Sequence, residues 1–222
     1  MKRRDFITLL GGAAAAWPFA ARAQQPGKVA RVGVLMLGSP DPAFFLREFN
    51  EGLRELGYME GRNVALELRN AKGSAAALAS LARELVALKV DVIVGFQTPS
   101  VAAAKAATAE IPIVMCPAAD PIGTGFIKSF ARPGGNITGM TTATAELAGK
   151  NLDLIREALP AVRRIGVVGN ALDPFHKPFL EHVASAARIL NFEIKITLAQ
   201  GADHFASAFA EIVKNGVEAV MV

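Results

Sequence analysis

The sequence predicts an α/β protein made of two doubly wound lobes, each with a parallel sheet that carries helices on its faces. Short runs of β-branched and apolar residues alternate with amphipathic helical stretches along the chain. Such runs are typical of parallel strands that are buried on both faces. The same series of runs then occurs a second time, and strands that alternate with helices imply right-handed crossovers within a parallel sheet.

The first series predicts four strands and three helices. The expected strands lie at residues 30–37, 63–69, 91–96 and 111–116, and the expected helices at residues 43–56, 75–88 and 101–109. In the first of these helices the apolar side chains are spaced by three or four residues, which forms one buried stripe. Gly57 follows that helix, in the position where helices commonly end in a left-handed conformation.

The second series repeats the first in the same order. It predicts strands at residues 163–170, 192–198 and 218–222, and helices at residues 179–190 and 206–214. "RVGVL" at Arg31 corresponds to "RIGVV" at Arg164, "ELGY" to "ILNF", and "VDVIV" to "VEAVMV". These three correspondences predict two lobes of one topology. Because the sequence ends within the third strand of the second series, we expect the second lobe to be incomplete and the sequence to be a fragment.

The stretch "ARPGGNITGMTT", residues 131–142, separates the two series. It lacks the spacing of a phosphate-binding P-loop, and its N-glycosylation pattern at Asn136 is incidental beside a bacterial-type export signal. We expect a turn at Gly134 and Gly135, followed by a crossover between the lobes at residues 137–142. The predicted boundaries are therefore 24–141 for the N-terminal lobe and 142–222 for the partial C-terminal lobe.

The first 23 residues carry the features of a cleaved signal peptide. A basic start at residues 2–4 precedes an apolar run at residues 6–20, which is too short to span a bilayer comfortably. The "ARA" at residues 21–23 fits the recognition rule of signal peptidase, so we expect cleavage near Ala23 and a periplasmic protein. Arg3 and Arg4 favour the twin-arginine route, and an ordinary secretory signal is the alternative.

Without that leader the chain is nearly neutral. The leader holds four of the 24 basic side chains and one of the 20 acidic ones, which leaves 20 basic and 19 acidic. Nucleic-acid-binding domains concentrate positive charge, so this balance does not indicate a nucleic-acid partner. Cys116 is the sole cysteine and lies far from the cleavage site. We therefore expect neither an intrachain disulfide nor a direct membrane anchor through a lipid-modified cysteine.

Ligands of open parallel sheets bind beyond the carboxyl ends of the strands, and this rule selects candidate residues. They are Ser39, Gln97, Thr98, Ser100 and Asp120 in the first lobe, and Asn170 and Asp173 in the second. Hydroxyls and free backbone N–H groups at helix starts favour a carboxylate, and Asp120 is suited to accept hydrogen bonds from an ammonium group. The set predicts a small zwitterion such as an amino acid.

Several of these residues also have a purely structural interpretation. Ser39 and Thr98 equally suit helix N-caps, and Asp120, which precedes Pro121, suits the opening of a turn. Phe96 suits either stacking on an aromatic ligand or packing in the core.

The sequence offers no arrangement typical of an enzyme, a metal site or a cofactor site. His176 and His182 are six residues apart, which places them on different faces of a helix and does not match metal-ligand spacing. A Gly-x-Ser-x-Gly elbow is missing, and Cys116 ends an apolar strand, where a thiol is usually inert. We expect a binding protein with no catalytic residue, no metal and no cofactor. A sensor that passes its ligand state to a signalling partner shares this fold and is one alternative, and a hydrolase or racemase on the same fold is another.

Four long stretches resemble one protein family. They are "FNEGLRELGYMEGRNVALELRNA", "LARELVALKVDVIVGFQTPS", "IPIVMCPAADPIGTGFIKSFARPGGNITGMT" and "GKNLDLIREALP". The blocks "ARPGGNITG" and "LRELGYMEGRN" are the most specific, and the resemblance covers nearly all of the chain after the leader. The sequence thus resembles the ABC transporter substrate-binding family, whose characterised relatives take aromatic amino acids.

The resemblance implies a bilobal periplasmic binding protein of the type I class, which captures a small ligand between its lobes and delivers it to ABC permease subunits. It also implies a longer protein, with roughly the last third lying beyond this sequence. Two positions depart from the family pattern: Asn70 stands where tryptophan is usual, and Gln97 where glycine is usual. Gln97 lies at a strand end that faces the expected cleft, so we expect it to alter ligand preference.

Overall fold

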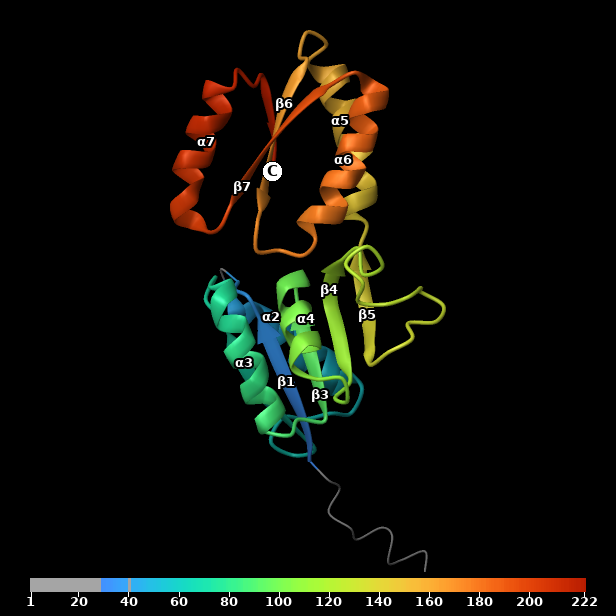
Figure 1. Ribbon diagram of the computed structural model, residues 1–222. Helices are drawn as coiled ribbons and strands as arrows, with labels where there is room; N and C mark the ends of the chain where they lie inside the picture. Colours follow the sequence, from blue (N-terminus) through green and yellow to red (C-terminus); the bar gives the residue numbers. More distant parts are fainter. Residues whose placement is uncertain (1–28, 40) are drawn as a thin grey trace, which may run out of the picture.

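The computed structural model describes residues 29–39 and 41–222, which form two α/β lobes joined end to end (Figure 1). The signal peptide expected at residues 1–23 lies outside these described residues. Within the described part of the chain, every helix is too short or too polar to cross a membrane.

The first lobe contains a five-stranded parallel sheet in the order β2-β1-β3-β4-β5. Its elements are β1 (Ala30–Met36), α2 (Pro42–Glu55), β2 (Val64–Asn70), α3 (Ala75–Ala87), β3 (Val92–Phe96), α4 (Thr98–Ala107), β4 (Ile113–Ala119) and β5 (Ile137–Thr142). The second lobe contains a three-stranded parallel sheet in the order β7-β6-β8. Its elements are α5 (Thr144–Ala158), β6 (Arg164–Asn170), α6 (His176–Leu190), β7 (Glu193–Ala199), the short 3-10 helix η1 (Ala202–His204), α7 (Phe205–Lys214) and β8 (Ala219–Met221).

The strand orders confirm the internal repeat. β2-β1-β3 in the first lobe and β7-β6-β8 in the second have the same topology, with the first strand of each series in the middle. The chain also turns in the same way after the first helix of each series. Gly57 has a φ of 84° after α2, and Asn191 is left-handed, with φ 57° and ψ 40°, after α6. Glycine and asparagine reach this region at the lowest steric cost, which explains both positions.

The expected crossover at residues 137–142 is wrong in one respect, because these residues form β5 and complete the first sheet. Ile113 is the register partner of Ile137, and Ala119 is the partner of Thr142. The sequence signal was weak because Ile137 is the only buried residue of β5. Gly139 allows the close approach to β4: a Cβ at this position would lie 2.4 Å from the carbonyl oxygen of Met115. The first lobe therefore has five strands rather than four before the chain leaves it.

Two other element boundaries differ from the expected ones, and both differences lie at the carboxyl edge of the first sheet. α4 begins at Thr98, three residues before the expected start, and β4 continues through Pro117 to Ala119. The carbonyl oxygen of Pro117 still accepts a hydrogen bond from the backbone N–H of Gln97 at 3.1 Å. The missing N–H of Pro117 therefore does not end the strand.

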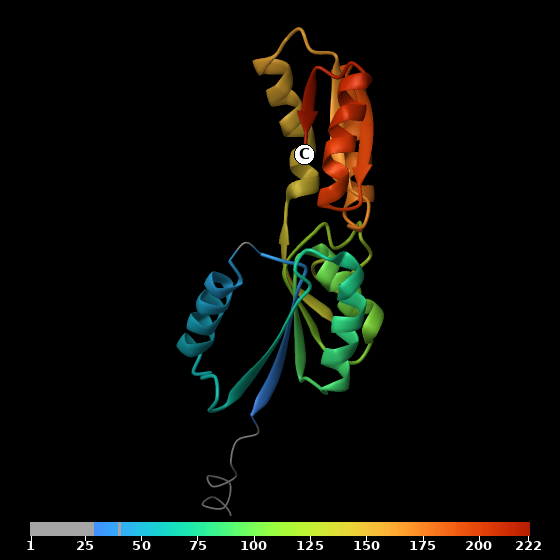
Figure 2. The same cartoon turned by 90° about the vertical axis from the view of Figure 1, so that its left-hand side faces the viewer.

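The two faces of the first sheet are covered unequally. α3 and α4 lie over one face, where Leu35, Ile93 and Ile113 are completely buried. α2 lies alone over the other face (Figure 2) and has no fully buried residue of its own. Phe45 and Phe49 of α2 are only partly buried against this face of the sheet. The core of the first lobe is therefore concentrated under α3 and α4.

The carboxyl ends of the two sheets face each other. In Figure 1 the arrows of the first sheet point toward the second lobe, and the arrow of β6 points back toward the first. This arrangement gathers the loops that follow the strands into the region between the lobes, where open α/β sheets bind their ligands.

Candidate ligand-binding site

A cavity of about 280 Å³ lies between the lobes and is called the interlobe cavity here. Both lobes contribute to its walls. Its lining residues are Leu37, Gln97, Thr98, Pro99, Pro117, Ala118, Ala119, Thr142, Thr144, Asp173 and Phe175. The volume is close to the lower end of the range for small-molecule sites, which begins at roughly 300 Å³.

The first-lobe wall of the interlobe cavity is the start of α4. Thr98 is the first residue of this helix, and only 4% of its surface is exposed. Its Oγ1 accepts a hydrogen bond from the backbone N–H of Ala119 at 3.0 Å, which ties α4 to the end of β4. The N-cap position belongs to Gln97, so the N-cap interpretation of Thr98 is wrong. Backbone N–H groups in the first turn of a helix have no carbonyl partner within the helix, and they attract anions. Pro99 has no N–H, so among the α4 residues that line the cavity Thr98 carries this donor.

The second-lobe wall carries a carboxylate. Asp173 follows β6, and its Oδ1 accepts a hydrogen bond from the backbone N–H of Phe175 at 2.9 Å. Burial raises the pKa of Asp173 above its ordinary value, although that hydrogen bond and the nearby His176 act in the opposite direction. The interlobe cavity therefore has a helix N-terminus in one lobe and a partly desolvated carboxylate in the other.

Gln97 separates the interlobe cavity from a neighbouring cavity in the first lobe. Its backbone has φ 70° and ψ 157°, a region that is essentially restricted to glycine and costs other residues about 1–3 kcal/mol. Glycine would occupy this backbone conformation without strain, whereas Gln97 is strained in it. Its side chain is exposed and lines both cavities.

The neighbouring cavity, called the lobe-one cavity here, has a volume of about 650 Å³. It is lined by Leu37, Gly38, Ser39, Pro42, Asn70, Lys72, Gly73 and Gln97. The Oγ of Ser39 accepts a hydrogen bond from the N–H of Asp41 at 3.3 Å, and Asp41 is the N-cap of α2. The N-cap interpretation of Ser39 is therefore wrong. Asn70 and Gln97 both line this cavity.

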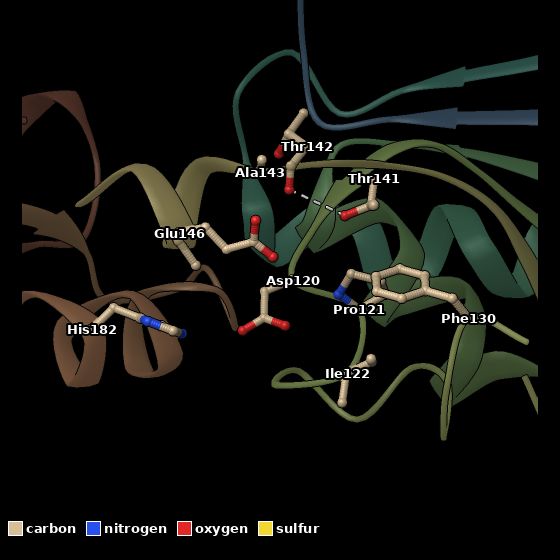
Figure 3. A pocket seen from close by; sticks show the side chains of 10 residues that line it. Asp120, Pro121, Ile122, Phe130, Thr141, Thr142, Ala143, Glu146 and His182 are labelled. Carbon is tan, nitrogen blue, oxygen red and sulfur yellow. Dashed lines mark hydrogen bonds between the residues drawn. The ribbon is translucent and has the colours of Figure 1, made fainter. Parts of the chain in front are cut away.

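Asp120 lies elsewhere, in a third cavity of about 400 Å³ beside the chain crossover (Figure 3), which is called the hinge cavity here. Its Oδ1 accepts a hydrogen bond from the backbone N–H of Gly123 at 2.8 Å, and its φ is 37°. Asp120 thus opens a turn, as its structural interpretation proposed. Glu146 from α5 projects into the same cavity, and His182 from α6 also lines it.

Neither Ser100 nor Phe96 lines the interlobe cavity, the lobe-one cavity or the hinge cavity. Ser100 is completely buried, and its Oγ has no hydrogen-bond partner among the described residues. The ring of Phe96 packs against Phe45, with their centroids 4.8 Å apart. This contact favours the core interpretation of Phe96.

Asn170 lies at the end of β6, in a cavity of about 190 Å³ within the second lobe. Its Oδ1 accepts a hydrogen bond from the backbone N–H of Leu172 at 3.0 Å. Asp173 and Phe175 line both this cavity and the interlobe cavity, so Asn170 lies next to the interlobe cavity without lining it.

Residues 39–222 match the profile of a family described as ABC transporter substrate binding protein. The protein belongs to this family. This substrate-binding protein is 33% identical over 146 residues to the tyrosine-binding protein of Clostridioides difficile (strain R20291). That alignment covers 66% of this chain and 42% of the relative.

Two solved structures resemble this chain in sequence and fold. A conserved domain protein from Vibrio cholerae is 29% identical with a TM-score of 0.78, over 87% of this chain and 64% of that one. An ABC domain from Streptococcus pneumoniae in complex with L-Trp is 27% identical with a TM-score of 0.76, over 86% of this chain and 64% of that one. The fold is that of the type I periplasmic binding proteins. The chain spans less than two thirds of the length of these relatives. One of them is named as a binding protein, and another is in complex with L-Trp.

The structure of this substrate-binding protein thus brings together only some of the predicted site residues. Gln97, Thr98 and Asp173 share the interlobe cavity, and Ser39 joins Gln97 in the lobe-one cavity. Sequence reasoning missed Thr142, Thr144 and Phe175. Thr142 ends the unrecognised strand β5, and Phe175 follows Asp173 in a loop, so the only available signal was their nearness to strand ends.

No group of three or more metal-binding side chains occurs among the residues that the structure describes. The interlobe cavity is lined by groups that suit noncovalent contacts with a charged molecule. It presents partial positive charge from α4, negative charge from Asp173 and a neutral carboxamide from Gln97.

Proposed function

We propose that this protein captures a small zwitterion, an amino acid, in the interlobe cavity and delivers it to the permease subunits of an ABC importer. The observation that carries the proposal is that the α4 N-terminus of one lobe and Asp173 of the other line the same cavity. An amino acid carries one negative and one positive group, and these two walls complement them. The relatives, one tyrosine-binding and one in complex with L-Trp, support the same ligand class.

The ligand carboxylate would bind at the N-terminus of α4, where Thr98 carries a first-turn N–H group and lines the cavity. A helix N-terminus carries partial positive charge and unpaired donors, which together favour an anion. Thr98 contributes by fixing this end of α4 to β4 through its hydrogen bond with Ala119.

The ligand ammonium would pair with Asp173 rather than with Asp120. Both are aspartates that follow a strand, but only Asp173 lines the cavity that contains the start of α4. A charge-assisted hydrogen bond in a partly desolvated site is stronger than one in water. Pairing across the cavity would also favour closure of the lobes about the crossover, since the two partners belong to different lobes.

The experiment is isothermal titration calorimetry of the full-length protein with the twenty amino acids, a sugar panel and divalent metals. We expect saturable 1:1 binding of at least one amino acid, and unchanged ligand when the mixture is recovered and analysed by mass spectrometry. Binding of sugars or metals alone would contradict the proposed ligand class. Chemical conversion of the ligand would contradict the assignment as a binding protein.

The proposal includes export to the periplasm, with residues 1–23 as signal peptide and lobes at residues 24–141 and 142–222. Mass spectrometry of the periplasmic fraction should find a protein that begins at Gln24. Replacing Arg3 and Arg4 together by lysine should trap the precursor if the twin-arginine route is used. Normal export of that variant would indicate the general secretory route.

A further inference from the structure

We infer that Gln97 determines specificity, and that it selects an amino acid whose side chain ends in a carboxylate or a carboxamide. The side chain of the ligand would extend from the interlobe cavity past Gln97 into the lobe-one cavity. This inference rests on the proposed function, because it assumes that the amino-acid head group binds in the interlobe cavity.

The position of Gln97 between the two cavities is the first observation. Gln97 and Leu37 line both, so a ligand whose head group lies against α4 has the lobe-one cavity within reach of its side chain. The Gln97 side chain is exposed, and the structure records no hydrogen bond of its carboxamide with a described residue. The carboxamide is thus available to a ligand at the junction of the cavities.

The backbone of Gln97 is the second observation. Its N–H donates to the carbonyl of Pro117 at 3.1 Å, and its own carbonyl accepts from the N–H of Val101 at 3.3 Å. These contacts hold the residue at φ 70° and ψ 157°, where glycine alone is unstrained. A long polar side chain kept at a strained position on a cavity wall points to a functional constraint on that side chain.

The chemistry of the lobe-one cavity is the third observation. Its polar side chains are those of Ser39, Asn70, Lys72 and Gln97. The Oδ1 of Asn70 already accepts a hydrogen bond from the backbone N–H of Lys72 at 2.8 Å, which leaves the Asn70 amide nitrogen as a donor. Among the described residues that line this cavity there is neither a carboxylate nor an aromatic ring.

This donor-rich wall suits a group that accepts hydrogen bonds. Two amides, one hydroxyl and one ammonium match the oxygens of a carboxylate or carboxamide. An indole or phenol ring would find few apolar partners here, since Leu37 and Pro42 are the only large apolar side chains that line the cavity from the described residues. The cavity therefore favours a polar amino acid over the aromatic ones named for the two relatives.

Calorimetry of the full-length protein with L-glutamate, L-glutamine, L-tyrosine and L-tryptophan tests the inference. We expect glutamate or glutamine to bind most tightly, and the comparison of the two identifies the terminal group. Gln97→Ala removes the carboxamide but keeps the backbone strain, and it should lower the affinity for the preferred ligand about tenfold or more. Gln97→Gly should weaken it similarly while raising the melting temperature, because glycine relieves the strain.

Lys89→Gly is the matched control. Lys89 also has a positive φ, 53°, but it lies before β3, at the opposite end of that strand from Gln97. This variant should change the melting temperature without changing the order of ligand affinities. If wild type binds no amino acid, the proposed function itself fails. If wild type prefers tyrosine or tryptophan, or if Gln97→Ala binds glutamate and glutamine as tightly as wild type, the specificity inference is overturned while the proposed function stands.

Discussion

The interlobe cavity and the hinge cavity both lie between the lobes, and each receives an aspartate that follows a strand and precedes a proline. Their charges differ. In the interlobe cavity Asp173 shares the space with the start of α4, whereas in the hinge cavity Asp120 shares it with the carboxylate of Glu146 (Figure 3). A zwitterion satisfies the first arrangement, but its carboxylate would be repelled in the second. The surroundings of an aspartate therefore decide its role more than its place in the sequence.

Removing the negative charge of Asp173 should have the largest effect on ligand affinity. Asp173→Asn keeps an oxygen that can accept from the N–H of Phe175, but removes the negative charge that would pair with the ligand ammonium. We expect amino-acid affinity to fall about 100-fold, or about 2.7 kcal/mol, by calorimetry. Asp120→Asn is the matched control, because Asp120 also accepts a backbone N–H through Oδ1, and it should change affinity less than about threefold. A larger loss of affinity for Asp120→Asn than for Asp173→Asn would indicate that the ligand binds in the hinge cavity instead.

The pH dependence of binding is the next effect. Burial raises the pKa of Asp173, so protonation begins at a higher pH than for an ordinary aspartate, whose pKa is about 3.9. Amino-acid affinity should therefore fall as the pH is lowered through the raised pKa of Asp173, and Asp173→Asn should remove that part of the profile. Calorimetry between about pH 4 and pH 7 measures both. An identical acid loss in wild type and Asp173→Asn would contradict this assignment.

The same raised pKa predicts the opposite pH dependence for the stability of the ligand-free protein: affinity falls at low pH, whereas stability rises. A carboxyl group whose pKa is raised by folding contributes stability that is present at low pH and is lost as the pH rises through the folded pKa. Ionised Asp173 thus lowers the free energy of unfolding at neutral pH. Asp173→Asn should stabilise the ligand-free protein in urea melts at pH 7 while it weakens binding. Destabilisation by this variant would show that the charge is needed structurally.

Thr98→Val should produce a smaller effect. Valine removes the acceptor for the N–H of Ala119 in a buried environment, which costs about 1–2 kcal/mol of unfolding free energy. The start of α4 would then be less firmly held, and affinity should fall several-fold. Thr98→Ser keeps the hydroxyl, so both its unfolding free energy and its ligand affinity should be close to those of wild type. Equal behaviour of the valine and serine variants would exclude a role for this hydrogen bond.

The smallest effect belongs to Glu146→Gln in the hinge cavity. This exposed residue lines the hinge cavity but not the interlobe cavity, so the substitution should leave amino-acid affinity within about twofold of wild type. Calorimetry under the same conditions measures it. A marked gain or loss of affinity would indicate that the ligand reaches the hinge cavity.

Much of the fold was predictable because it depends on local patterns. Apolar runs identified the strands of both lobes except β5, and Gly57 and Asn191 marked the ends of equivalent helices. β5 was missed because five of its six residues are exposed and only Ile137 gives the apolar signal of a strand. Its pairing depends instead on Gly139, whose role becomes visible only when β4 lies beside it.

The site was less predictable than the fold. The ends of strands identify which edge of the sheet binds ligand, but they do not show which residues of the other lobe lie beside each strand end. Asp120 and Asp173 have the same local signature, and the sequence alone favoured Asp120 for the ammonium. Their separation follows from topology: β4 lies beside β5, where the chain crosses between lobes, whereas β6 is the central strand of its sheet. The backbone strain at Gln97 was not predictable from the sequence either, because it depends on the direction that the chain takes between β3 and α4.

A crystal structure of the full-length protein with its tightest-binding amino acid would show directly which cavity holds the ligand. We expect density for the ligand in the interlobe cavity, with its carboxylate at the N-terminus of α4 and its ammonium within hydrogen-bond distance of Asp173. Density in the hinge cavity beside Asp120 and Glu146, with the interlobe cavity filled only by water, would contradict this expectation.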